Sequence, residues 1–117
     1  MRASAALQKS LQPAEASELK KLARQAGKAA RLLKLLGNEN RLLIMCLLAV
    51  RGEVTVGGLV EALELSQSAL SQHLARLRRD GLIAFRRQSQ TLHYRIADQR
   101  AAQILEVLKD IYCKDMK

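Results

Sequence analysis

The sequence predicts a mainly α-helical protein with one small β-hairpin. Apolar residues recur every three or four positions along most of the 117 residues, the period of helices that bury one face. Between Leu82 and Ile96 the period changes to two, which is typical of half-buried strands. The longest apolar run, Leu42–Val50, is far shorter than the roughly 20 residues that cross a bilayer. It therefore predicts a buried helix.

The composition predicts a polyanionic partner. Twenty Lys and Arg side chains against 11 Asp and Glu give a net charge of +9, and nucleic acid is the commonest partner of so basic a small domain. The N-terminus lacks the apolar core of a secretory signal, so we expect a cytoplasmic protein. Two cysteines are too few for a secreted disulfide scaffold, and in a reducing compartment they should be free thiols.

Residues 1–13 are small and polar, and we expect them to form a flexible arm before a single domain at residues 14–117. The first helix should run from Pro13 to Gly37. Its apolar positions step by three and four residues, a spacing suited to packing against another helix. These positions are Leu19, Leu22, Ala26, Ala29, Leu33 and Leu36.

A second helix, at about 39–51, is apolar on nearly every face and should occupy the centre of the fold. Thr55 can cap a short helix that ends near Leu63, although Gly57 and Gly58 leave its first residue open. Ser66 is a good cap for the next helix, which should end before Gly81.

The alternating stretch predicts a hairpin, and a last helix at about 99–114 follows it. We expect the hairpin tip to carry Arg86, Arg87, Gln88, Ser89 and Gln90. The apolar stripe of the last helix contains Ala101, Ile104, Leu108 and Ile111.

This order of elements is that of a winged helix-turn-helix, in which one helix enters the major groove of duplex DNA and the hairpin is the wing. Short polar side chains in the first turns after Ser66 could contact base edges, and the basic residues could hold phosphates. The predicted base contacts are Gln67, Ser68, Ser71 and Gln72; the predicted backbone contacts are Arg76, Arg79, Arg86, Arg87, Gln88 and Gln90. The alternative is that these polar side chains only face solvent.

Such a module contacts few base pairs. The stripes of the first and last helices have no evident partner in one small core, so we expect a homodimer through these helices on a pseudo-palindromic operator.

Three stretches, "LKLLGNENRLLIMCLL", "LSQSALSQHLARLRRDGLI" and "RRQSQTLHYRI", resemble the ArsR/SmtB family of bacterial winged-helix repressors over roughly residues 29–113. The resemblance implies that an effector bound away from the DNA face lowers operator affinity. Metal sensors of this family carry a Cys-x-Cys pair or histidines on the last helix. Here Thr55 and Gly57 stand where the Cys-x-Cys pair would be needed, and the last helix has no histidine. We therefore expect no metal or other cofactor.

Cys46 and Cys113 remain as candidate sensing residues. Free cysteine commonly packs as a small hydrophobe, which is the simplest explanation of two isolated thiols. Their contexts, "IMCLL" and "DIYC", resemble the BigR/SqrR branch, in which cysteines at these positions respond to persulfides and other reactive sulfur species. Lys109 and Lys114 should favour the Cys113 thiolate, whereas Asp110 opposes it.

The expected function is a sequence-specific DNA-binding repressor whose operator affinity changes when persulfide or polysulfide cross-links the two cysteines. Three alternatives stay open: a regulator that answers general thiol oxidants, an anti-repressor that displaces another DNA-binding protein, and a metal sensor with an unfamiliar Cys/His site. No Cys-x-x-Cys, glycine-rich phosphate loop or paired His and carboxylate suggests an enzyme.

Overall fold

A computed structural model describes residues 11–113, which form two compact units that divide after Leu35. Most of the expected arm at residues 1–13 lies outside the described residues. The described part of the first unit is formed mainly by helix α2 (Pro13–Leu36), whose last residue belongs to the second unit. The helix begins at the predicted Pro13 and ends one residue before the predicted Gly37. Of its predicted stripe, Leu36 is buried, whereas Leu22 and Leu33 are 63% and 57% exposed in one chain. Leu32 and Leu35, which lie outside the predicted stripe, are also buried.

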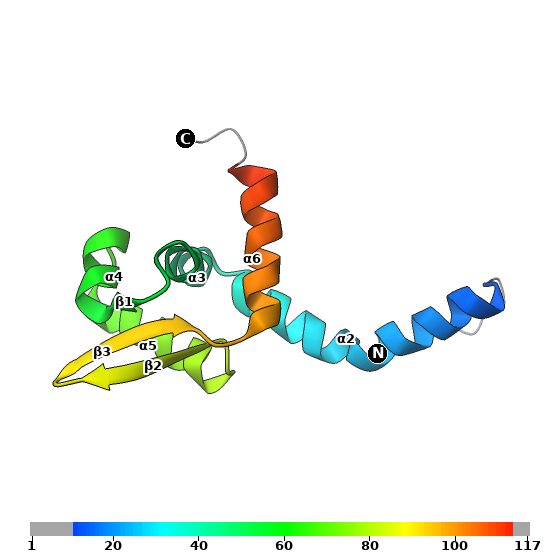
Figure 1. Ribbon diagram of the computed structural model, residues 1–117, viewed down its shortest axis with the longest axis horizontal. Helices are drawn as coiled ribbons and strands as arrows, with labels where there is room; N and C mark the ends of the chain where they lie inside the picture. Colours follow the sequence, from blue (N-terminus) through cyan, green and yellow to red (C-terminus); the bar gives the residue numbers. More distant parts are fainter. Residues whose placement is uncertain (1–10, 114–117) are drawn as a thin grey trace. The chain divides into compact units, whose positions relative to one another are not determined.

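The second unit is organised around helix α3, which packs against three other helices and the sheet (Figure 1). Ile44, Met45 and Leu48 of α3 are almost completely buried, as expected of the central helix. The elements of this unit are α3 (Glu39–Arg51), β1 (Val54–Thr55), α4 (Val56–Leu63), α5 (Gln67–Arg79), β2 (Ile83–Gln88), β3 (Thr91–Ile96) and α6 (Gln99–Tyr112).

The ends of these helices follow local chemistry. The side chains of Asn38, Thr55, Ser66 and Asp98 accept hydrogen bonds from backbone N–H groups two or three residues later, at 2.8–3.1 Å. Gly52 follows α3 with a φ of +86°, and Gly81 follows α5 with a φ of +80°, conformations that glycine adopts without strain. The predicted caps at Thr55 and Ser66 are confirmed.

The hairpin belongs to a three-stranded antiparallel sheet of order β1-β3-β2. Phe85 of β2 and Val54 of β1 both pair with Tyr94 of β3, and the Phe85 and Tyr94 rings meet edge to face at 5.5 Å. Strand β1 was not predicted from the sequence, because two residues show no alternation and their partners are distant along the chain. The mainly α fold with a β wing, the winged helix-turn-helix, is confirmed.

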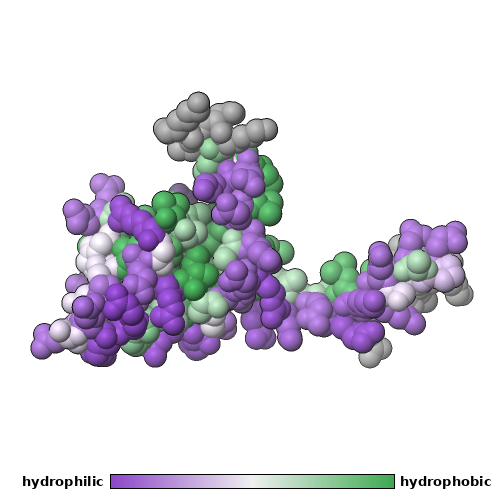
Figure 2. Space-filling view, viewed as in Figure 1, coloured by the Kyte–Doolittle hydropathy of each residue, from purple (hydrophilic) through white to green (hydrophobic). Residues whose placement is uncertain are grey.

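The surface separates polar from apolar regions. Hydrophilic side chains gather over the β2–β3 hairpin, and hydrophobic ones reach the surface near α3 and α6 (Figure 2). Within residues 11–113, every helix is too short or too polar to span a bilayer.

Candidate nucleic-acid interface and thiol pocket

Helix α5 separates a buried face from a polar one. Leu70, Leu74 and Leu77 are buried where the helix packs against α3, α4 and β2. The four predicted base contacts, Gln67, Ser68, Ser71 and Gln72, are all exposed. At 100° per residue their positions lie on one side of the helix, within its first two turns. The structure therefore places these side chains together where they can reach a groove.

The C-terminal turn of α5 is basic and is tied to the wing. Arg76 and Arg79 are exposed, and Arg76 Nε lies 3.5 Å from Asp80 Oδ2. Arg78 was not among the predicted DNA contacts, and its guanidinium lies 4.3 Å from the centroid of the Phe85 ring. This cation–π contact connects the predicted reading helix directly to strand β2.

The wing departs from the expected arrangement at its tip. Strand pairing continues to Gln88 and Thr91, so only Ser89 and Gln90 form the turn, and Ser89 has a φ of +57°. Arg86 and Arg87 were predicted to lie at the tip but belong to β2, because the loop has two residues and not five. Arg87, Gln88 and Gln90 are exposed.

Arg86 is engaged within the protein. Its Nε and Nη2 donate to the two carboxylate oxygens of Glu53 at 3.0 Å each, and its Nη1 donates to Gln88 Oε1 at 3.1 Å. The hydrogen bond from Arg86 lowers the pKa of Glu53, aided by the charges of Arg86, His93 and Arg95. Sequence reasoning missed Glu53, because 33 residues separate it from Arg86.

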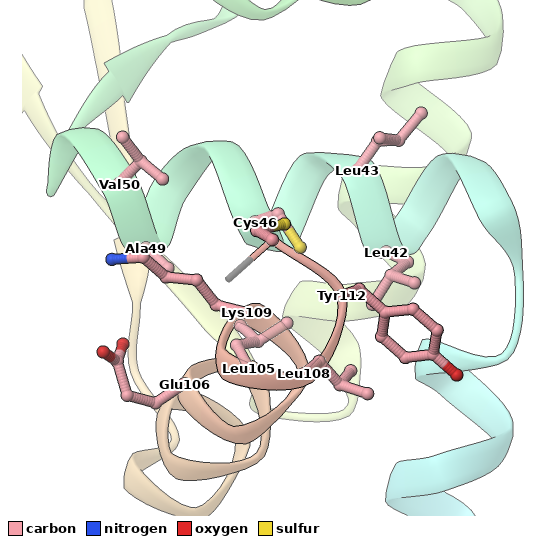
Figure 3. Close-up of a pocket in the computed structure, with 11 residues that line it drawn as sticks. Leu42, Leu43, Cys46, Ala49, Val50, Leu105, Glu106, Leu108, Lys109 and Tyr112 are labelled. Atoms are coloured by element: carbon pink, nitrogen blue, oxygen red, sulfur yellow. The ribbon is translucent and has the colours of Figure 1, made fainter. Parts of the chain in front are cut away.

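The two cysteines line one pocket between α3 and α6, with a volume of about 390 Å³. Cys46 is half-buried in the middle of α3, and Cys113 is exposed at the C-cap of α6. Figure 3 shows Cys46 on the face of α3 that looks toward α6, with Leu42 at one end of the pocket and Ala49 at the other. Two cysteines far apart in the sequence therefore line the same pocket.

The environment of the two thiols differs. Burial is the main cause that raises the pKa of Cys46, and a charge on Cys113 raises it further. Lys109 lines the same pocket, whereas Lys114 lies outside the described residues. Cys113 is the more accessible of the two thiols.

The described residues provide few ligands for a metal ion. Across residues 11–113 of one chain, no three His, Cys, Asp or Glu side chains come together in an arrangement that could hold an ion. Of the described residues, those on the pocket lining that could bind a metal are the two cysteines and one carboxylate, that of Glu106.

Comparison with known proteins identifies the family. A family model described as "Bacterial regulatory protein, arsR family" matches residues 38–84. The transcriptional activator HlyU of Vibrio cholerae serotype O1 is 46% identical over 96 residues, which are 82% of this chain and 88% of that protein. The chain belongs to the arsR family. It is a DNA-binding transcriptional regulator and not an enzyme.

Solved structures of this family share the fold. Reduced HlyU from Vibrio cholerae N16961 superposes with a TM-score of 0.76 at 46% identity, covering 80% of this chain and 98% of that one. The transcriptional repressor BigR from Xylella fastidiosa gives a TM-score of 0.75 at 36% identity, over 80% of this chain and 95% of that one.

Proposed function

We propose that the chain is a transcriptional repressor whose affinity for DNA is switched when reactive sulfur joins Cys46 to Cys113. The observation that carries the proposal is that both thiols line one pocket between α3 and α6. Among related proteins, BigR is described as a transcriptional repressor, which supports the repressor part of the proposal, whereas HlyU is described as a transcriptional activator.

The chemistry begins at the exposed thiol. The Cys113 thiolate attacks a sulfane sulfur of a polysulfide, forming a Cys113 persulfide and releasing the shortened donor as an anion. Cys46, after losing its proton to solvent, attacks Cys113 Sγ; a disulfide forms and hydrosulfide leaves. If Cys46 also becomes a persulfide, condensation of the two persulfides gives a trisulfide bridge and hydrogen sulfide. In each route the sulfur donor is the oxidant, and the two thiols are oxidised.

The position of α3 provides a path to DNA. This helix contacts α6 on one side and the predicted reading helix α5 on another. A bond between Cys46 and Cys113 restricts how α3 and α6 move relative to each other, and α5 packs on the same scaffold. A shift of about 3 kcal/mol between two conformations would change DNA affinity by about 150-fold.

We further propose that the protein acts as a homodimer on a pseudo-palindromic operator. Large apolar side chains on the two helices that were predicted to pair remain exposed in one chain: Leu22 and Leu33 of α2 and Ile111 of α6. A second copy would cover such surfaces and would place two α5 helices about 34 Å apart, one turn of DNA. Gln67, Ser68, Ser71 and Gln72 would then contact bases, and Arg76, Arg79, Arg86, Arg87, Gln88 and Gln90 the backbone.

The decisive experiment is a binding titration with a fluorescent duplex from the region upstream of the protein's own gene. We expect the reduced protein to bind it and sodium tetrasulfide to weaken binding at least tenfold. Cys46→Ser and Cys113→Ser should bind the duplex with the affinity of the reduced parent, and tetrasulfide should not change that affinity. Release of the double variant from DNA by the same treatment would refute the proposal.

Mass spectrometry separates this proposal from a general oxidant response. Tetrasulfide should leave either a disulfide or a bridge heavier by one or more sulfur atoms, and only the heavier bridge marks sulfur selectivity; peroxide should react far more slowly. Equal reaction with peroxide and a plain disulfide in both cases would instead indicate a general thiol-redox regulator.

A further inference from the structure

The pocket that holds the thiols has mostly apolar walls. Leu42 and Val50 line it from α3, and Leu105, Leu108 and Tyr112 line it from α6 (Figure 3). Val50 is 73% exposed although it belongs to the lining, so the pocket opens to solvent beside it. A small molecule can therefore enter the pocket without unfolding of the helices around it.

The described lining of the pocket does not favour the binding of an anion. Among the described residues, the charged ones that line it are Glu106 and Lys109, and their charges have opposite sign. The same burial that raises the pKa of Cys46 disfavours any other negative charge beside it. An ionised donor that approaches Cys46 must lose part of its hydration, a cost that neutral molecules avoid.

We infer that this pocket selects neutral, apolar organic polysulfanes, such as dialkyl trisulfanes, over charged sulfur donors such as glutathione trisulfide. The inference rests on the proposed function, because it assumes that joining the two cysteines is the signal. The alkyl groups of a dialkyl trisulfane would pack against the leucine walls while its sulfur chain lies between Cys46 and Cys113.

The reaction is balanced without a further oxidant. The Cys113 thiolate attacks an outer sulfur of the trisulfane, forming a mixed disulfide with one alkylthio group and expelling the alkyl persulfide anion. Cys46 then attacks Cys113 Sγ, which releases the alkyl thiolate and closes the protein disulfide. The two protons of the thiols end on the released thiol and persulfide, so two thiols and one trisulfane become one disulfide, one thiol and one persulfide.

The test compares rate constants for loss of the protein thiols with dipropyl trisulfide and with glutathione trisulfide. Each rate constant is divided by that of N-acetylcysteine amide with the same donor, which removes the intrinsic reactivity of the donor. Measurements at about 0.15 M salt screen the long-range attraction of anions to this basic chain. We expect the normalised preference for dipropyl trisulfide to be at least tenfold.

A matched pair of variants locates the selectivity. Val50→Lys adds an ammonium group at the pocket mouth and should reduce the preference at least fivefold. Val107→Lys adds the same charge on α6 at a residue that is 55% exposed and does not line the pocket, so it should keep the parent preference. Melting curves of both variants report whether they are folded.

The outcomes separate the inference from the proposed function. Cross-linking by both donors with equal normalised rates, or equal effects of the two lysine variants, would overturn the inference and leave the sulfur switch standing. Failure of both donors and of tetrasulfide to join the cysteines would overturn the proposed function together with the inference.

Discussion

Joining Cys46 to Cys113 within one chain should stabilise the protein strongly. The bond closes a loop of about 67 residues, and the loss of chain entropy in the unfolded state then corresponds to about 4 kcal/mol. Unfolding entropies of about 2.1 cal/mol/K per residue convert this value into a rise in Tm of roughly 15–20 °C for a chain of this length. The rise is expected because the two thiols line one pocket, so the bond should form with little distortion of α3 or α6.

The assay is differential scanning calorimetry of the reduced protein and of the protein treated with sodium tetrasulfide, after removal of intermolecular cross-links by gel filtration in denaturant. Cys113→Ser under the same treatment is the control and should melt like the reduced parent. An unchanged or lower Tm in the cross-linked parent would show that bond formation distorts the native helices. That result would refute the expectation that the two thiols of this pocket can be joined without strain.

Three further outcomes follow from contacts elsewhere in the fold. A methyl group on Gly58 would lie 2.9 Å from Val54 Cγ1, whereas one on Gly57 would meet nothing closer than 4.0 Å. In urea titrations, Gly58→Ala should lower the free energy of unfolding by about 1–3 kcal/mol, and Gly57→Ala should raise it by up to about 1 kcal/mol. Equal effects of the two substitutions would contradict this packing. Glu53→Gln should release Arg86 and strengthen DNA binding, and the binding constant should fall more steeply with salt concentration, by about one released counterion. Weaker binding would mean that Glu53 orients Arg86 for phosphate contact. Arg86 lowers the pKa of Glu53, so the pair stabilises the fold above the carboxyl pKa of the unfolded chain, and this contribution is lost as pH falls through the lower pKa of the folded state. The difference in unfolding free energy between the parent and Glu53→Gln should therefore shrink from pH 6 to pH 3. A constant difference in urea titrations would show that the ion pair does not couple to folding.

Local chemistry accounts for the elements that were predicted correctly. Ser66 and Thr55 accept hydrogen bonds from backbone groups three residues later, and Gly52 and Gly81 adopt positive φ, so each helix boundary depends on a few neighbouring residues. The hairpin is similarly local, because its two strands are joined by a two-residue turn. Such features are visible in the order of residues before any tertiary contact is known.

The sequence by itself therefore determined the helices, the hairpin, the polar face of α5 and the two thiols. Only the tertiary structure decided that Glu53 holds Arg86, that β1 joins the sheet beside β3, and that Cys46 and Cys113 open into one pocket. Each of these pairs residues more than 30 positions apart. Periodicity specifies which side of an element is apolar, but the packing of several elements around α3 chooses which of those sides meet.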